Sequence, residues 1–162
     1  MDEAALRHRV EAIRWYHQID LRPGLRTPGL DDPRERLRML PLPEDLSWRE
    51  VLDVGPWHGF FSFEAERRGA RRVVAADSFA RSGANWSTKE GFLLAREALG
   101  SRVEDADVDV MDLSPASVGE FDLVLMLGVS RDSTAYRLAR AAKRLARRER
   151  VWQGRLAVHA FK

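Results

Sequence analysis

The pattern of hydrophobic and polar positions changes near residue 50. Before it, Leu6, Val10 and Ile13 recur at helical spacing, which predicts an amphipathic helix over residues 3–18. Five prolines between residues 19 and 48 predict an irregular crossing with a short helix at 33–40. After residue 50, short apolar runs alternate with helical patterns. We therefore divide the chain into a lead-in segment, residues 1–49, and a domain, residues 50–162, that together form one structural unit.

The second part of the chain has the order of elements expected for a doubly wound α/β domain. Gly69 ends its first predicted helix, while Ser87 and Glu90 have capping-box spacing at the start of the second, which Gly100 ends. The expected strands are residues 51–55, 71–77, 103–113, 121–129 and 154–161, and the expected helices are residues 59–69, 87–100 and 135–149. Strands that alternate with helices pair in parallel through right-handed crossovers, which predicts a Rossmann-like parallel sheet of order 3-2-1-4-5.

Composition and charge limit the class of protein. The chain has 162 residues, enough for one domain, and its lack of cysteine excludes disulfides, thiolate metal sites and a cysteine nucleophile. We find no secretory segment and no run of about 20 apolar residues, so we expect a soluble cytoplasmic protein that makes no membrane contact. Residues 135–162 hold nine Lys and Arg against one acid, a net charge of +8, whereas residues 1–134 carry −6. The basic residues at 137–150 could bind RNA, although a solvated helix face is the simpler interpretation.

The turn after the first strand of the domain carries the strongest chemical signal. In doubly wound sheets a ligand binds beyond the carboxyl ends of the strands, where the strand order reverses. Gly55 and Gly59 allow the backbone to approach a ligand, and a helix that begins near Gly59 presents free N–H groups there. A dinucleotide fingerprint would need glycines where Trp57 and Phe60 stand, which disfavours NAD, and the sequence contains no P-loop motif. A nucleotide other than NAD is the expected class of ligand.

These residues resemble the class I S-adenosylmethionine-dependent methyltransferases. In that family the first strand carries an acid two residues before the first glycine of a D/E-x-G-x-G-x-G turn. Asp53, Gly55 and Gly59 match this pattern, and Trp57 replaces the middle glycine. The resemblance implies S-adenosylmethionine as the cofactor, with Asp77 on its ribose hydroxyls, "VDVMDL" beside its adenine and "FDLVLMLGV" as the fourth-strand motif. The remaining cofactor-binding residues that it implies are Ser78, Asp109, Val110, Met111, Leu127 and Gly128.

A narrower resemblance extends over residues 14–130. The segments "WYHQIDL", "TPG", "GPWHGFFSFEAERRGA", "EALGS" and "DLSP" together resemble the bacterial methyltransferases related to the tRNA wobble-uridine carboxymethyl transferases. Members usually have an acid where His58 stands and a "LYH"-like segment after "LGV", which this sequence lacks. The last two strands of the usual seven-stranded sheet would also be absent. An exposed edge strand would result, through which two copies could pair as a homodimer.

Several side chains have expected roles in binding or catalysis. Asp53 is expected to meet the cofactor's amino group directly or through water, because a buried carboxylate needs a partner. Trp57 either packs over the methionine part or the methyl group of the cofactor, or fills the space of the missing glycine. Of the four histidines, His17 in "WYH" is the candidate catalytic base, since a neutral imidazole over the site could accept a substrate proton.

The form of the cofactor and the orientation of its adenine depend on other residues. Either Asp109 or Asp112 would face the adenine amino group. The lead-in segment offers Arg34, Arg36 and Arg38, but no lysine, to a carboxylated cofactor, so ordinary S-adenosylmethionine is expected.

Three functions fit these features. The first is a methyltransferase that passes a methyl group by in-line displacement to an oxygen, nitrogen or carbon of a small molecule. The second is a truncated or non-catalytic domain that keeps only the binding of a nucleoside or a partner chain. The third is a tRNA-modifying transferase. Methyl turnover separates the first from the second, and RNA binding that weakens steeply with salt marks the third.

Overall fold

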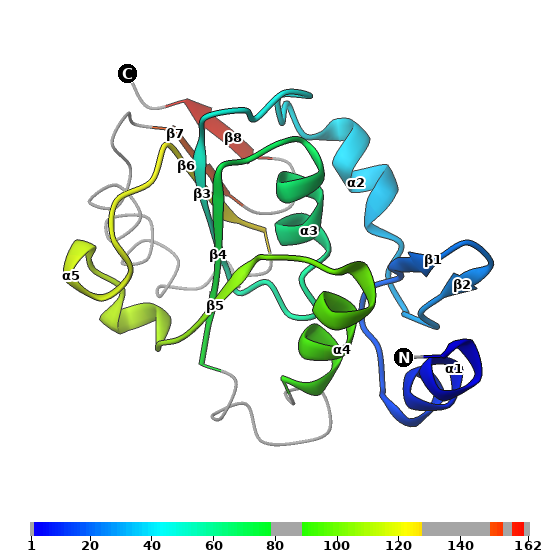
Figure 1. Cartoon of the computed structure of the whole chain (residues 1–162). Coiled ribbons are helices and arrows are strands. Elements are labelled where there is room, and N and C mark those ends of the chain that lie inside the picture. Colours follow the sequence, from blue (N-terminus) through cyan, green and yellow to red (C-terminus); the bar gives the residue numbers. More distant parts are fainter. Residues whose placement is uncertain (1, 79–88, 128–149, 154–156, 161–162) are drawn as a thin grey trace.

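The structure is a computed structural model that describes residues 2–78, 89–127, 150–153 and 157–160. Its central feature is one six-stranded sheet, with α3 (Phe60–Arg67) and α4 (Glu90–Leu99) against one face (Figure 1). The strands of this sheet are β3 (Glu50–Val54), β4 (Arg72–Asp77), β5 (Glu104–Asp107), β6 (Leu123–Met126), β7 (Arg150–Gln153) and β8 (Ala157–Ala160).

The strand order of the sheet is β5-β4-β3-β6-β7-β8. The first five strands in this order pair in parallel, which confirms the predicted doubly wound sheet of order 3-2-1-4-5. The fifth parallel strand is β7, however, and not residues 154–161. That range contains β8, which runs antiparallel beside β7 and forms the edge of the sheet. The sheet therefore has one strand more than predicted, because the four residues of β7 are too few to separate by pattern from the basic run before them.

The lead-in segment is more regular than its prolines suggest. Helix α1 (Glu3–Ala12) ends before the predicted residue 18, and the Trp15 indole N–H donates to the carbonyl of Val10 at 2.8 Å. A hairpin of β1 (Asp20–Arg22) and β2 (Leu25–Arg26), which we did not predict, follows. The expected short helix is present as α2 (Pro33–Met39), whose first turn Asp32 caps.

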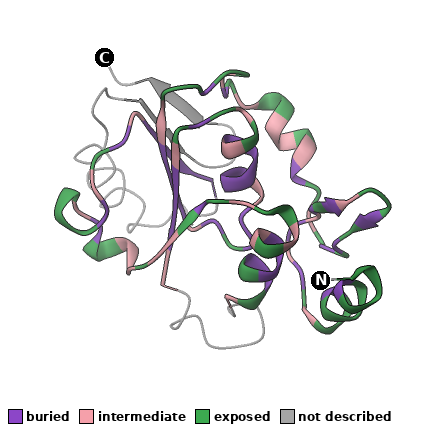
Figure 2. Cartoon of the chain, in the orientation of Figure 1, coloured by how far each residue is buried: buried purple, intermediate pink, exposed green. Residues whose placement is uncertain are grey.

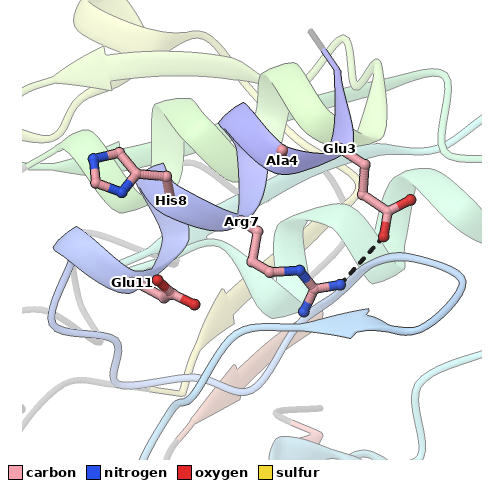
Figure 3. A pocket seen from close by; sticks show the side chains of 5 residues that line it. All are labelled: Glu3, Ala4, Arg7, His8 and Glu11. Carbon is pink, nitrogen blue, oxygen red and sulfur yellow. Dashed lines mark hydrogen bonds and ion pairs between the residues drawn. The ribbon is translucent and has the colours of Figure 1, made fainter.

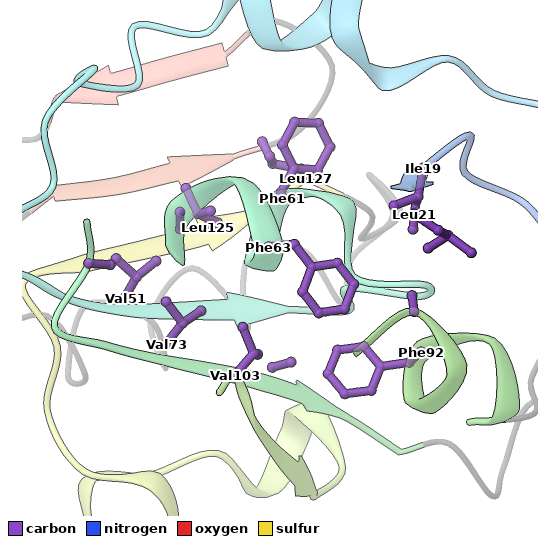
Figure 4. Close-up of a cluster of buried hydrophobic side chains, with 14 of the residues drawn as sticks. Ile19, Leu21, Val51, Phe61, Phe63, Val73, Phe92, Val103, Leu125 and Leu127 are labelled. Atoms are coloured by element: carbon purple, nitrogen blue, oxygen red, sulfur yellow. The ribbon is translucent and has the colours of Figure 1, made fainter. Parts of the chain in front are cut away.

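Alternate residues of the strands point to opposite faces of the sheet and form two hydrophobic clusters. The larger cluster lies between the sheet and the α3–α4 layer, and the lead-in segment adds Ile19 and Leu21 to it (Figure 4). Leu6, Trp15 and Leu46 of the lead-in segment belong to the same cluster. β3, β4 and β6 are almost wholly buried, while β5 is partly exposed (Figure 2). The lead-in segment and the sheet therefore share one core.

Local signals placed most helix ends correctly. Gly59 and Gly100 flank α3 and α4 in the left-handed conformation, and Gly100 is the stop that the sequence indicates. The predicted third strand, residues 103–113, is shorter in the structure: β5 ends at Asp107, and a 3-10 turn, η1 (Val110–Asp112), follows. The short helix α5 (Pro115–Val118) begins at "DLSP" with a capping box. Ser87 and the predicted helix at 135–149 lie outside the described residues.

Candidate functional site

The turn after β3 has a backbone suited to glycine at three positions. Gly55, Trp57 and Gly59 have φ of 69°, 52° and 87°, all in the left-handed region. A Cβ atom on Gly59 would lie 2.7 Å from the ring of Phe92, so only glycine fits where α3 meets α4. Trp57 keeps the left-handed backbone that glycine adopts freely, although an L-residue is strained there. Trp57 in place of the expected glycine therefore adds a side chain to this turn, while the backbone stays left-handed.

Hydrogen bonds join this turn to the end of the neighbouring strand. The N–H of Gly55 donates to the carbonyl of Ala76 at 2.9 Å. The backbone N–H groups of Trp57 and Ser78 donate to the carboxylate of Asp77. Burial raises the pKa of Asp77 above its usual range, and these two hydrogen bonds oppose that shift. The carboxyl ends of β3 and β4 therefore form one connected rim, with Asp77 at its centre.

Asp53 lies beneath the rim, on the face of the sheet that α3 covers. It is 2% exposed, and the hydroxyl of Ser62 donates to its Oδ2 atom at 2.7 Å. Burial raises the pKa of Asp53 to about 7, and the negative charge of Asp77 contributes to this shift. Sequence analysis did not single out Ser62, although a small polar residue between Phe61 and Phe63 on an apolar helix face could have indicated a buried partner.

The backbone of His17 is held by the "TPG" turn of the lead-in segment. The hydroxyl of Thr27 donates to the carbonyl of His17 at 2.7 Å, and the N–H of Asp31 donates to the carbonyl of Tyr16 at 2.8 Å. A Cβ atom on Gly29 would collide with the His17 backbone. "WYH" and "TPG", which are separate motifs in the sequence, therefore form one unit that positions His17.

The imidazole of His17 is buried against the turn. It is 5% exposed, its Nδ1 atom has no hydrogen-bond partner among the described residues, and its ring lies 6.2–6.5 Å from those of Trp57, Phe60 and Phe61. Burial lowers the pKa of His17 to about 3, and the charges of His58 and Arg36 act in the same direction. The ring is therefore neutral at physiological pH, with one nitrogen able to accept a hydrogen bond.

His58 connects the turn to the lead-in segment. It is 3% exposed, and its Nδ1 atom accepts a hydrogen bond from the N–H of Tyr16 at 3.1 Å. Burial lowers the pKa of His58 to about 4, so this nitrogen remains an acceptor. The proteins that the sequence resembles usually have an acid here. In this fold the residue at position 58 accepts a hydrogen bond from the Tyr16 N–H, and a neutral imidazole can do so.

The other predicted cofactor residues follow the neighbouring strands. Asp109 comes two residues after β5 and accepts a hydrogen bond from the N–H of Met111 at 2.9 Å, which fixes the start of η1. Met111 is 40% exposed. Leu127 follows β6 and is buried in the larger hydrophobic cluster. Because parallel strands end at the same edge, these segments flank the rim around Asp77. Gly128 lies outside the described residues.

Of Arg34, Arg36 and Arg38, which the sequence offered to a carboxylated cofactor, two are engaged in ion pairs. Arg36 contacts Asp31 at 2.8 Å, and Arg34 contacts Asp20 at 2.9 Å. The Nε atom of Arg38 donates to the Arg34 carbonyl at 3.3 Å. Within the described part of the chain, no group of three acidic or histidine side chains is arranged to hold a metal. No described helix combines the length and apolar character that crossing a membrane requires.

Two hollows lie away from the rim. A groove of about 730 Å³ follows the outer side of α3, with Phe60, Phe63 and Leu37 among its apolar residues. A hollow of about 400 Å³ lies on α1, where Glu3 and Arg7 form an ion pair (Figure 3). Neither hollow is lined by Asp53, Asp77 or the turn after β3.

Comparison with known proteins supports the fold. No protein-family model matches this sequence, and no curated protein matches it. The N-terminal domain of EvdMO1, solved with SAH bound, matches with a TM-score of 0.67 and 22% identity over 90% of this chain and 63% of that one. An S-adenosylmethionine-dependent methyltransferase from Mesorhizobium loti matches with a TM-score of 0.51 and 22% identity over 70% of this chain and 48% of that one.

A further match extends over nearly the whole chain. A protein from Pyrococcus horikoshii, described provisionally as an RNA methyltransferase, has a TM-score of 0.57 and 17% identity over 97% of this chain and 74% of that one. The chain therefore spans about half to three quarters of the length of these proteins. The protein has the Rossmann-like fold of the class I methyltransferases.

Proposed function

We propose that this protein is an S-adenosylmethionine-dependent methyltransferase that acts on an oxygen, nitrogen or carbon atom of a small molecule. The observation that carries the proposal is the rim, in which the glycine-like turn after β3 is hydrogen-bonded to Asp77 at the end of β4. Ligands bind at this edge in doubly wound sheets. A carboxylate there can accept both ribose hydroxyls, and the left-handed turn leaves room for a nucleoside.

The residues at this edge fit the chemical groups of that cofactor. Asp77 and Ser78 would hold the ribose, while Asp109, Val110 and Met111 would line the adenine. Gly55, Trp57 and Gly59 would face the amino-acid part, with Asp53 presenting its remaining oxygen from beneath. Leu127 and Gly128 would close the far side. When bound, the sulfonium supplies an already activated methyl group, so the protein contributes mainly alignment.

His17 would act on the acceptor. The Nδ1 atom of its neutral imidazole is buried and has no hydrogen-bond partner among the described residues. This atom can accept a hydrogen bond from the O–H or N–H group that receives the methyl group. Since burial holds its pKa at about 3, a proton taken by His17 would not stay there. We therefore propose that His17 orients the methyl-accepting group through this hydrogen bond, and that the proton released on transfer to an oxygen or nitrogen goes to solvent water.

Calorimetric titration with S-adenosylmethionine tests this function. We expect Asp77→Ala to raise the dissociation constant by at least about tenfold, the size expected for loss of charge-assisted hydrogen bonds. Asp53→Asn should weaken binding less, because the asparagine oxygen still accepts from Ser62. The matched control is Asp122→Asn, since Asp122 accepts the Glu50 N–H at the opposite edge of the sheet and should not affect binding. A well-folded wild-type protein that binds no S-adenosylmethionine would contradict the proposal.

RNA is a second candidate acceptor. The net charge of +8 over residues 135–162 favours it, as does the narrower resemblance to tRNA-modifying transferases. The basic residues 137–149 lie outside the described residues, so what they add to this candidate is their charge and no observed geometry.

A further inference from the structure

The side chain of Trp57 has an energetic cost that the proposed function does not explain. Its backbone has a φ of 52°, which glycine would adopt without strain. Burial does not account for its presence either, because the residue remains 39% exposed. A strained backbone that carries a partly exposed aromatic ring at a candidate site indicates that the ring itself has a role.

The surroundings of the ring favour a positively charged ligand. The Tyr16 ring meets the Trp57 ring edge to face, with ring centroids 3.9 Å apart, and so fixes its orientation. The backbone N–H of Trp57 donates to the Asp77 carboxylate, and Asp107 lies beside Asp77 in the sheet. An indole face attracts cations more strongly than other aromatic rings do. The neighbouring imidazole of His17 is neutral and does not repel a cation.

We propose that the Trp57 ring, oriented by Tyr16, recognises the positive charge of the sulfonium and so distinguishes the cofactor from its thioether product. This inference rests on the proposed function. Methyl transfer breaks the S–CH₃ bond, leaves the electron pair on sulfur and forms a bond between the methyl group and the acceptor. The positive charge is then lost from the sulfur. A ring that attracts the cation therefore holds the methyl donor and releases the product.

The test compares two ligands that differ in the transferred methyl group and the sulfur charge. Dissociation constants of the full chain for S-adenosylmethionine and S-adenosylhomocysteine are measured calorimetrically for wild type, Trp57→Leu and Trp57→Phe. Leucine keeps an apolar side chain on the strained backbone but removes the π face. We expect Trp57→Leu to weaken S-adenosylmethionine binding by about 2- to 30-fold, the range of cation–π interactions, and S-adenosylhomocysteine binding less than about twofold. Trp57→Phe should lose only part of the discrimination.

Trp48 provides a matched control. It is the other described non-glycine residue with a positive φ, 68°, it is 83% exposed, and it precedes β3 at the opposite edge of the sheet. Trp48→Leu should leave both dissociation constants unchanged. We expect Trp48→Gly and Trp57→Gly to raise the melting temperature, because glycine relieves the backbone strain at both positions. Such a rise for Trp57→Gly would show that the Trp57 site tolerates substitution.

Three outcomes would overturn the inference. If Trp57→Leu weakens the binding of both ligands equally, the ring makes only apolar contact with them and does not distinguish the charge of the sulfur. If it weakens neither, the ring does not contact the cofactor. If the wild-type protein binds neither ligand, the proposed function fails together with this inference, and that result is recognisable before any variant is made.

Discussion

Asp53 is a carboxyl group in a position that disfavours its charge. It is fully buried, Ser62 supplies its one described side-chain hydrogen bond, and Asp77 adds a second negative charge nearby. The ionised form is therefore less stable in the folded protein than in the unfolded chain. A cation bound at the rim would stabilise the ionised form of Asp53. In the ligand-free protein, ionisation of Asp53 therefore lowers the free energy of unfolding.

This cost gives a prediction for the pH dependence of stability. Between pH ~4 and ~7 the unfolded chain loses the Asp53 proton before the folded protein does, so the contribution of Asp53 to stability falls as pH rises through this window. Asp53→Asn removes the titration. We expect the variant to gain stability relative to wild type as pH rises from 4 to 8, by a few kcal/mol in order of magnitude. Urea unfolding of both proteins across this range measures the difference.

The pH dependence of the stability difference between the two proteins serves as the control for this prediction. An asparagine amide that lacks a partner in the core would shift the stability of the variant by a similar amount at every pH. A difference between the two proteins that does not change with pH would contradict the raised pKa of Asp53, whatever its size.

At the scale of elements, the N-terminal half of α4 is fitted to the turn. Gly91 lies within α4 and touches the His58 ring, which in turn accepts the N–H of Tyr16. A helix interior favours alanine over glycine by about 1 kcal/mol. A Cβ atom on Gly91 would nevertheless collide with the imidazole. The glycine therefore makes it possible for α4, the turn and the lead-in segment to pack together.

Gly91→Ala should destabilise the protein by about 1–3 kcal/mol, the usual cost of overpacking, despite the better helix propensity of alanine. It should also loosen the segment around Tyr16, whose amide would exchange faster with solvent. Urea unfolding and hydrogen exchange measure the two effects.

A double-mutant cycle tests the cause of this destabilisation. His58→Asn has a smaller side chain that still offers an acceptor, and in that background Gly91→Ala should cost much less. An equal cost in both backgrounds would show that contact with His58 is not the reason.

At the scale of the whole molecule, charge is divided between two regions. Residues 1–134 carry −6, and residues 135–162 carry +8. A net negative charge disfavours a polyanion, so we expect affinity for RNA to come mainly from the basic segment.

The RNA alternative therefore predicts a steep dependence on salt. Binding of a tRNA should weaken linearly on a log–log plot against salt concentration, and replacing the arginines at 137, 140, 144, 147 and 148 with glutamine should reduce the slope by up to about 4. Replacing Arg71 and Arg102, which lie on the body, should leave the slope unchanged. Fluorescence anisotropy at several salt concentrations gives the slope. Binding that does not respond to salt would exclude this role.

The sequence by itself determined the features that depend on local pattern. Alternating apolar strands and helices indicated the doubly wound sheet and its order, because parallel pairing through right-handed crossovers permits few arrangements. Gly100 gave a helix end, and the Asp53-to-Gly59 pattern located the turn. These signals lie within a few residues of one another, where sequence and local conformation are closely coupled.

Only the tertiary structure decided which distant segments meet. No local pattern shows that Ser62 binds Asp53, that His58 replaces an acid as acceptor for Tyr16, or that the "TPG" turn supports His17. Strands β7 and β8 were also misplaced, since a strand of four residues is defined by its neighbours in the sheet more than by its own pattern. Each of these contacts joins residues that are far apart or belong to separate elements, and its energy arises only when the core packs.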